Sequence, residues 1–261
     1  MAVALDNEMY KLEGDQWWGD DKPLHLLLTA IAPARLAYLD SLRSAELFDP
    51  AGRTVVDIGC GGGLFAEELA RLGMNVIGVD PAEASLQAAR THARNSGLDI
   101  DYRLGVGEDL PLEDSSVDMA VCVDVLEHVD DIGVVLRETA RVLRAGGLYL
   151  FDTVNRTPLS WLVAIKMGQD WPLTRFQPPH LHDWAHFVTP RELRVAASGA
   201  GLVVKGMKGM APQGNPAGWL RPIRQLQKGT LTYGEFGRRL RFHLVDDLHL
   251  AYVGHAVKSA A

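Results

Sequence analysis

Apolar and polar residues alternate along the middle of the chain in the manner of strands separated by helices. Short apolar, β-branched runs predict strands near residues 53–58, 74–79, 100–104, 117–123 and 147–153. Between them the apolar residues recur at helical spacing, which predicts helices near 63–72, 82–96 and 131–144. Because strands joined through helices pair in parallel, this order predicts an α/β fold with a mostly parallel sheet and right-handed crossovers.

The two ends of the chain depart from this alternation. Residues 1–50 predict a helical cap, and residues 51–153 form the alternating core. Residues 154–188 are rich in Pro, Trp and His, which is typical of a lid or binding segment. Residues 189–261 predict one helix and two further strands, 202–208 and 248–258, the last antiparallel, with an insertion at 213–244. We therefore expect a single domain around a seven-stranded sheet.

The first predicted strand ends in a glycine-dense turn that leads into a helix. Gly59, Gly61 and Gly63 permit positive φ and a close approach by a ligand, and the helix N-terminus offers unpaired amides. A dinucleotide fingerprint requires a small residue where Leu64 stands. A nicotinamide dehydrogenase, the rival from another enzyme class, is therefore disfavoured.

Two acidic residues indicate which ligand suits this turn. Asp57 precedes the turn, where its charge would oppose a pyrophosphate but suit an ammonium group. Asp80 closes the second strand about twenty residues further on, where an acid can bind both ribose hydroxyls. S-adenosyl-L-methionine meets both requirements, with S-adenosyl-L-homocysteine as the product of methyl transfer. The loop from Gly105 to Pro111 is expected to hold the adenine through backbone groups, with Glu108 or Asp109 as a side-chain contact.

Composition excludes several other classes of protein. The net charge of −7 argues against a general nucleic-acid binder. The two cysteines, Cys60 and Cys122, lack metal-ligand spacing and form no disulfide framework, which fits a reducing compartment. Residues 1–14 lack a signal-peptide core, and the most apolar tract, 24–39, is too short and too interrupted to span a bilayer. We therefore expect a cytoplasmic protein.

Several motifs together resemble one enzyme family. The run Val55–Gly63, followed by Val125–Val129, is similar to class I S-adenosylmethionine-dependent methyltransferases. Further segments resemble the ubiquinone-biosynthesis O-methyltransferases: Trp17-Trp18, Lys22–His25, Pro33–Leu36, Asn155–Trp161, His182–Trp184 and Phe187–Pro190. The resemblance implies a Rossmann-like fold and an O-methyltransferase that acts on a phenolic, catechol- or quinol-like acceptor.

Three departures from the family leave the acceptor open. The spacer between His25 and Pro33 is longer by about one helical turn. Residues 178–181 replace a shorter, glycine-containing turn, and the 213–244 insertion is longer and more basic than expected. The altered segments 172–182 and 213–244 motivate the alternative of a secondary-metabolism O-methyltransferase with a soluble aromatic acceptor. Further alternatives are a C- or N-methyltransferase of natural-product biosynthesis and an S-adenosylmethionine-binding enzyme that transfers no methyl group. The presence of Asp80 and of the Glu127-His128 pair disfavours the last of these.

The resemblance also implies cofactor contacts, because in the family the arginine of the Pro-x-Arg-Leu stretch, the first loop glycine and the acid after the second strand all touch the cofactor. With their neighbours, the expected cofactor-binding residues are Arg35, Asp57, Gly59, Cys60, Gly61, Asp80, Pro81, Gly107, Glu108 and Val123.

Methyl transfer from a sulfonium is an in-line displacement, and a phenolic hydroxyl needs a base or a metal ion to become nucleophilic. Asp124, Glu127 and His128 resemble the family's ligands for a divalent cation such as Mg²⁺. One alternative is that His128 is itself the general base, and another is that Glu127 and His128 only cap the next helix. His182 is the expected contact to the acceptor, so Glu127, His128 and His182 are the candidate catalytic residues.

The aromatic residues of the lid indicate an apolar acceptor. Resemblance to enzymes whose acceptor carries a polyprenyl tail implies a small, prenylated aromatic acceptor and peripheral membrane contact through residues 155–185. The basic insertion would add attraction to an anionic surface. The alternative is that the basic residues of the insertion only form an ordinary solvated surface that binds no membrane.

Overall fold

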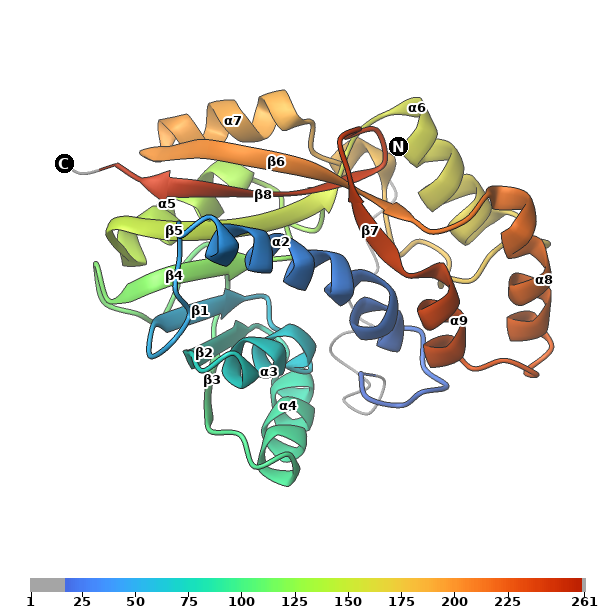
Figure 1. The fold of residues 1–261 in the computed structure, drawn as a ribbon, viewed down its shortest axis with the longest axis horizontal. Coiled ribbons are helices and arrows are strands. Elements are labelled where there is room, and N and C mark those ends of the chain that lie inside the picture. The colour runs from blue at the N-terminus through green and yellow to red at the C-terminus, as the bar shows by residue number, and fades with distance from the viewer. Residues whose placement is uncertain (1–16, 260–261) are drawn as a thin grey trace.

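The protein is described here by a computed structural model, which defines residues 17–259. These residues form an eight-stranded sheet in the order β3-β2-β1-β4-β5-β8-β6-β7 (Figure 1). The parallel strands are β1 (Thr54–Ile58), β2 (Asn75–Asp80), β3 (Ile100–Leu104), β4 (Val117–Cys122) and β5 (Leu143–Val154). The antiparallel strands are β6 (Leu202–Pro212), β7 (Phe242–Val245) and β8 (Ala251–Lys258).

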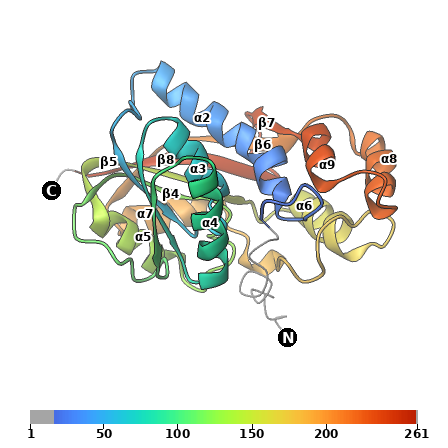
Figure 2. The ribbon, with the colours of Figure 1, turned by 90° about the horizontal axis from the view of Figure 1, so that it is seen from below.

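Helices cover both faces of this sheet, because successive residues of its buried strands point to opposite sides. On one face lie α2 (Ala32–Ser44), α3 (Leu64–Arg71) and α4 (Glu83–Asn95), packed on residues such as Val55. On the other face lie α5 (Ile132–Val142) and α7 (Pro190–Gly199), packed on residues such as Val56. Figure 2 shows α2 on one side of the strands and α5 with α7 on the other. The predicted alternation of strands and helices is confirmed.

The sheet has one strand more than the seven predicted. The additional strand is β7, which pairs with the end of β6 and lies within the stretch interpreted as an insertion. It is four residues long and stands at the edge of the sheet, so it carries only a weak local signal. The rest of the insertion forms α8 (Pro216–Gln227) and α9 (Tyr233–Leu240).

The lid is more regular than its sequence suggested. Its first part is helical, as α6 (Pro158–Ser160) and the π-helix η3 (Trp161–Asp170), and a short 3-10 helix η4 (Trp184–His186) follows. Thr157 starts the lid helix with a capping box, in which its hydroxyl accepts from the Ser160 amide. The density of Pro and Trp residues concealed this helix in the sequence.

The N-terminal cap is helical from His25 to Ser44, as a first turn, the π-helix η2 (Leu27–Ile31) and α2, whereas residues 17–24 form turns. The part of the cap predicted over residues 1–16 lies outside the described residues. The segment around η2 packs against the insertion through Leu26, Ala30, Phe236 and Leu240.

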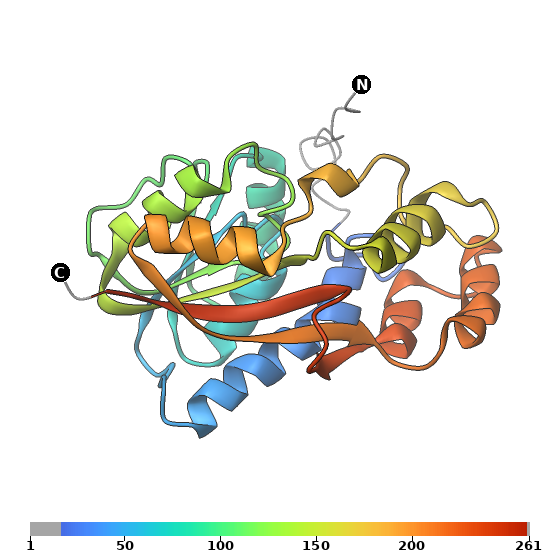
Figure 3. The same cartoon turned by 90° about the horizontal axis from the view of Figure 1, so that it is seen from above.

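The lid and the insertion meet at one end of the sheet, far from the C-terminus (Figures 1 and 3). The rings of Phe176 and Phe236 lie 5.3 Å apart, and Gln227 donates to the carbonyls of Pro172 and Arg175. Cap, lid and insertion therefore enclose the space beyond the parallel strands.

Candidate functional site

A cavity of about 480 Å³ opens at the carboxyl ends of β1, β2 and β4. In an open parallel sheet this edge, next to the switch in strand order between β1 and β4, is where ligands bind. Most expected cofactor contacts line the cavity: Arg35, Asp57, Gly59, Cys60, Asp80, Pro81, Gly107, Glu108 and Val123. Asp124, His128 and His182 line it as well, whereas Gly61 and Glu127 are not among its lining residues.

The glycine turn leaves no room for side chains. Gly59 has a φ of 70°, and a Cβ there would lie 2.4 Å from Val125. At Gly61, with a φ of 52°, a Cβ would lie 2.2 Å from the ring of Trp17. The turn then ends in α3, whose first amides lie next to the cavity.

Two tryptophans of the cap cover this turn. The indole of Trp17 donates to the hydroxyl of Ser85 over 3.0 Å. The indole of Trp18 donates to the carbonyl of Gly62 over 2.8 Å and stacks on the ring of His92 at 3.4 Å. The cap thus lies against the glycine turn.

Asp57 carries a buried carboxyl group that forms no ion pair with any of the residues 17–259. Its side chain is 1% exposed, and neither oxygen has a hydrogen-bond partner of normal geometry among residues 17–259. Burial raises its pKa to about 7, although the positive charge of Arg35 acts in the opposite direction. A cationic ligand in the cavity would stabilise the ionised form.

Asp80 joins the two loops that border the cofactor end of the cavity. One of its oxygens accepts from the amide of Gly61 and the other from the amide of Ala82, each over 2.8 Å. Burial raises the pKa of this carboxyl group, and the two amides counteract the shift. Each carboxylate oxygen can accept a second hydrogen bond, so both remain able to bind a ligand hydroxyl.

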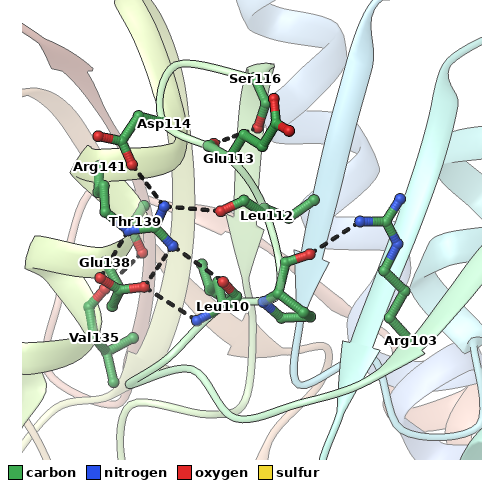
Figure 4. Close-up of polar contacts among 11 residues, drawn as sticks. Arg103, Leu110, Leu112, Glu113, Asp114, Ser116, Val135, Glu138, Thr139 and Arg141 are labelled. Carbon is green, nitrogen blue, oxygen red and sulfur yellow. Dashed lines mark hydrogen bonds and ion pairs between the residues drawn. The ribbon is translucent and has the colours of Figure 1, made fainter.

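The loop that carries Gly107 and Glu108 is fixed to α5 (Figure 4). Arg141 donates to the carbonyls of Leu110 and Leu112, and Glu138 accepts from the amide of Leu110 (Figure 4). Arg141 and Glu138 are also paired with each other over 2.8 Å. This network holds the loop from behind, with Gly107 and Glu108 on the cavity side.

Arg35 lies between two aspartates, Asp124 and Asp152, and pairs with both. Its side chain is almost fully buried, and the two carboxylates raise its pKa despite the cost of burial. The expected role of Arg35 at the cofactor is untested, but in this structure its charge is already balanced by the two acids. The sequence analysis did not identify Asp152 as a site residue. It could have been found as an acidic residue within the apolar strand 148–154, because a buried charge needs a partner.

Asp124 has a left-handed backbone, with a φ of 53°. Asp152 stabilises this turn, because its second oxygen accepts from the Asp124 amide over 2.8 Å. The Asp124 carboxylate is committed to Arg35 and does not join Glu127 and His128. Asp124 therefore lies outside the group of possible ligand atoms, and the predicted metal site of Asp124, Glu127 and His128 stays a prediction.

The structure instead groups Glu127 and His128 with His182 from the lid. One atom of each lies within 4.8 Å of the others, and the two imidazole rings are 5.3 Å apart. Glu127 accepts from the hydroxyl of Thr153 over 2.8 Å, while its other oxygen has no partner among residues 17–259. Burial raises the pKa of the Glu127 carboxyl group.

Burial has the opposite effect on the two histidines. It lowers the pKa of His128 to about 4 and that of His182 to about 3. At neutral pH both rings are therefore uncharged, and each carries one nitrogen lone pair that can take a proton or bind a metal ion.

The donors of this cluster are one carboxylate oxygen and two imidazole nitrogens. Mg²⁺ prefers oxygen ligands, so this set fits divalent ions that accept nitrogen, such as Mn²⁺ or Zn²⁺, better than the Mg²⁺ expected from the sequence. The same groups can also act without a metal ion, as a base beside a bound hydroxyl.

Comparison with known proteins agrees with this geometry. Residues 56–151 match the family model described as "Methyltransferase domain". The chain is 40% identical over 199 residues to a ubiquinone biosynthesis O-methyltransferase from Bordetella avium, an alignment that covers 75% of this chain and 78% of the relative. It is 36% identical to the protein of the same name from Alkalilimnicola ehrlichii, over 98% of this chain and 93% of the relative.

A solved structure shares the fold over nearly its whole length. Magnesium protoporphyrin IX methyltransferase from Synechocystis PCC 6803, with bound SAH, superposes with a TM-score of 0.60 at 17% identity. The superposition covers 97% of each chain. At this identity the match supports the fold alone.

Proposed function

This chain belongs to the family of the ubiquinone biosynthesis O-methyltransferases and is an S-adenosylmethionine-dependent methyltransferase, and we propose that it methylates a phenolic hydroxyl of a catechol- or quinol-like acceptor. One observation carries the proposal. A single cavity joins the acids of the cofactor end, Asp57 and Asp80, to the imidazoles of His128 and His182. Hydroxyl-activating groups and the methyl donor would thus share one enclosed space.

The residues at the cofactor end fit S-adenosylmethionine. The buried carboxyl group of Asp57 suits the ammonium of the methionine part, and the carboxylate of Asp80 suits the ribose hydroxyls. The loop at Gly107 and Glu108 borders the same space and is proposed to hold the adenine. When bound, S-adenosylmethionine supplies a methyl group on a positively charged sulfur.

The residues at the other end fit the activation of the acceptor. A phenolic hydroxyl must lose its proton to become a good nucleophile, and the neutral imidazoles of His128 and His182 offer lone pairs to it. Burial favours the neutral form of Glu127 in the cofactor-free protein. Positive charge that develops on the imidazoles would favour its ionised form, and the carboxylate would in turn stabilise that charge.

We further propose that Glu127, His128 and His182 can hold a divalent cation. A carboxylate oxygen without a partner beside two uncharged imidazoles is a suitable donor set. A cation there would lower the pKa of a bound hydroxyl. Chelation separates this role from direct base catalysis: activity that disappears with a chelator and returns with Mn²⁺ or Zn²⁺ supports the metal, and undiminished activity supports the base.

The remainder of the cavity suggests an acceptor with an apolar arm, in keeping with a ubiquinone-precursor-like molecule. The side chains of its wall there are apolar: Leu26 and Ile31 from the cap, Val163 and Phe176 from the lid, Leu240 and Phe242 from the insertion, and Met210 from β6. Such a wall favours a prenylated acceptor over a small, fully polar one.

The exposed apolar side chains of the lid support the proposal of membrane contact. Its exposed apolar side chains are Leu159, Trp161, Leu162, Trp171, Leu173 and Trp184. Concentrated exposure of this kind marks an interaction surface, and tryptophan is favoured at membrane interfaces. Within residues 17–259 no helix has the length and apolar character needed to cross a bilayer, so we propose attachment at the membrane surface.

The direct test of the proposed function is a panel of acceptors. The protein is incubated with methyl-labelled S-adenosylmethionine and with catechols, prenylated quinols or hydroxypyridones, and the products are analysed by NMR. We expect the label on a phenolic oxygen, with prenylated compounds preferred. Label on carbon or nitrogen, or transfer to none of the phenols, would contradict the proposal.

A further inference from the structure

Gln169 is a buried glutamine of the lid that contacts His182 at three points. Its side chain is 3% exposed. The amide Nε2 donates to the backbone carbonyl of His182 over 3.1 Å, and the amide Oε1 accepts from the backbone N–H of His182 over 2.7 Å. The same Oε1 lies 3.2 Å from Nδ1 of the His182 ring. Gln169 is not among the residues that line the cavity.

The two backbone contacts fix which way the amide of Gln169 points. A backbone N–H can only donate and a backbone carbonyl can only accept, so Oε1 must face the first and Nε2 the second. The ring nitrogen Nδ1 of His182 therefore faces an oxygen that can only accept. A hydrogen bond forms there only if Nδ1 carries the hydrogen.

A neutral imidazole carries one hydrogen, so a protonated Nδ1 leaves the lone pair on Nε2. We propose that Gln169 is a positioning residue that holds His182 in this tautomer and thereby leaves Nε2 as the nitrogen available to the acceptor or to a cation. The use of that lone pair in catalysis rests on the proposed function, whereas the tautomer itself does not.

The frame around Gln169 is rigid enough for this role. The carbonyl of the preceding residue, Gly168, accepts from the amides of Phe176 and Gln177, each over 3.0 Å. The lid helix is thus folded back onto the following loop immediately beside Gln169. Both backbone groups of His182 are held by Gln169. The ring itself packs against the rings of His128 and Phe187, with centroids 5.3 and 6.0 Å away, which keeps Nδ1 on the side of Gln169.

The alternative is that Gln169 only ties two lid segments together. The two backbone contacts alone would accomplish this, and the ring would then be free to take either tautomer. The two roles differ in one observable, the position of the hydrogen on the His182 ring.

The experiment uses full-length protein with ¹⁵N-labelled histidine, and a spectrum of His182→Asn assigns the resonances. We expect the wild-type His182 to carry its hydrogen on Nδ1. Gln169→Met, which keeps the length but removes both polar atoms, should give a mixture of tautomers or the Nε2–H form. Gln169→Glu retains an acceptor for Nδ1–H and should keep the wild-type tautomer. Gln177→Met should also keep it, because no hydrogen bond joins the side chain of this lid glutamine to His182 among the described residues.

Activity supplies a second readout. Gln169→Met should lower kcat by about tenfold or more with a smaller change in KM, since it disturbs the orientation of a reacting group rather than binding. Gln169→Glu should recover most of kcat.

An Nε2–H tautomer in the wild-type protein, or an unchanged tautomer in a folded Gln169→Met, would overturn the inference. Should that variant fail to fold, the wild-type and Gln169→Glu spectra decide alone: both must show Nδ1–H. Because the spectra are recorded without an acceptor, they stand or fall separately from the proposed methylation of phenols.

Discussion

Arg35 and Asp152 form an ion pair in which both side chains are almost completely shielded from solvent. The pair links α2 of the cap to the carboxyl end of β5, although the two residues are 117 positions apart. Asp124 closes a ring with them, because its carboxylate pairs with Arg35 and its amide donates to Asp152. The turn that leads to Glu127 and His128 is therefore held by the cap as well as by the sheet.

Removing one charge from this ring of Arg35, Asp124 and Asp152 should lower the free energy of unfolding considerably. Asp152→Asn leaves the buried guanidinium of Arg35 with Asp124 as its single charged partner, and loss of a partner from a buried ion pair costs about 3–5 kcal/mol. We expect a drop of that order in the free energy of unfolding, measured by urea denaturation.

The matched control is Asp40→Asn, which removes an acid paired with Arg43 at the surface, where both side chains are more than half exposed. It should change the free energy of unfolding by less than about 1 kcal/mol. Equal effects of the two substitutions would show that the buried ion pairs contribute no more to the free energy of unfolding than a surface pair does.

The raised pKa of Asp57 predicts a pH-dependent stability. Between the ordinary aspartate pKa of about 4 and the folded value of about 7, the cofactor-free folded protein binds a proton that the unfolded chain does not. The group therefore contributes stability at low pH that is lost as the pH rises through this range.

Asp57→Asn removes this dependence. The free energy of unfolding of the variant minus that of the wild type should rise between pH 5 and pH 8 by up to a few kcal/mol. Thermal or urea unfolding at several pH values measures it. A difference that stays constant or falls over this range would contradict the assignment of an unneutralised buried carboxyl group.

Asp80 is predicted to anchor the cofactor. Asp80→Ala removes the proposed contact to the ribose and also frees the amides of Gly61 and Ala82. Since hydrogen bonds to a charged group contribute about 1.5–3 kcal/mol, we expect S-adenosylmethionine to bind roughly 10–100-fold more weakly by calorimetry. Asp101→Ala, in an exposed acid of β3, serves as the control, and unchanged affinity in Asp80→Ala would remove this residue from the site.

The lid surface is predicted to bind membranes. Flotation with liposomes that contain anionic lipid should recover the wild-type protein, whereas a triple substitution of Trp161, Trp171 and Trp184 by Ala should stay in solution. The control is a protein in which two exposed apolar residues on other elements, Val195 and Val203, are replaced by Ala. This control protein should float with the liposomes as the wild type does. Equal flotation of all three proteins would exclude the lid as the contact.

The sequence identified those features whose signal is local. Strands β1 to β5 and helices α3 to α5 are recovered to within a few residues, because buried strands and amphipathic helices impose a period on their own residues. The glycine turn and Asp57 were found for the same reason: they follow one another in the chain.

Features that depend on tertiary packing were out of reach. The partners of Arg35 lie on β5 and after β4, far away in sequence, so its ion pairs could not be predicted; the cofactor contact that the family resemblance implies for Arg35 stays a prediction. Asp124 was grouped with Glu127 and His128 by resemblance to the family, and its pairing with Arg35, which accompanies a left-handed backbone, could not be foreseen from the sequence. The contacts of Gln169 depend on how the lid folds back, for which the sequence carries no periodic signal.

The most direct measurement is the rate of methyl transfer by Glu127→Gln at saturating S-adenosylmethionine, with a catechol acceptor that the wild type methylates on oxygen. We predict that the affinity for S-adenosylmethionine stays within about twofold of wild type, while the rate of O-methylation falls by about 10²–10⁴-fold, the usual contribution of groups that assist proton removal. A variant that transfers the methyl group at the wild-type rate would show that the cluster of Glu127, His128 and His182 does not activate the acceptor.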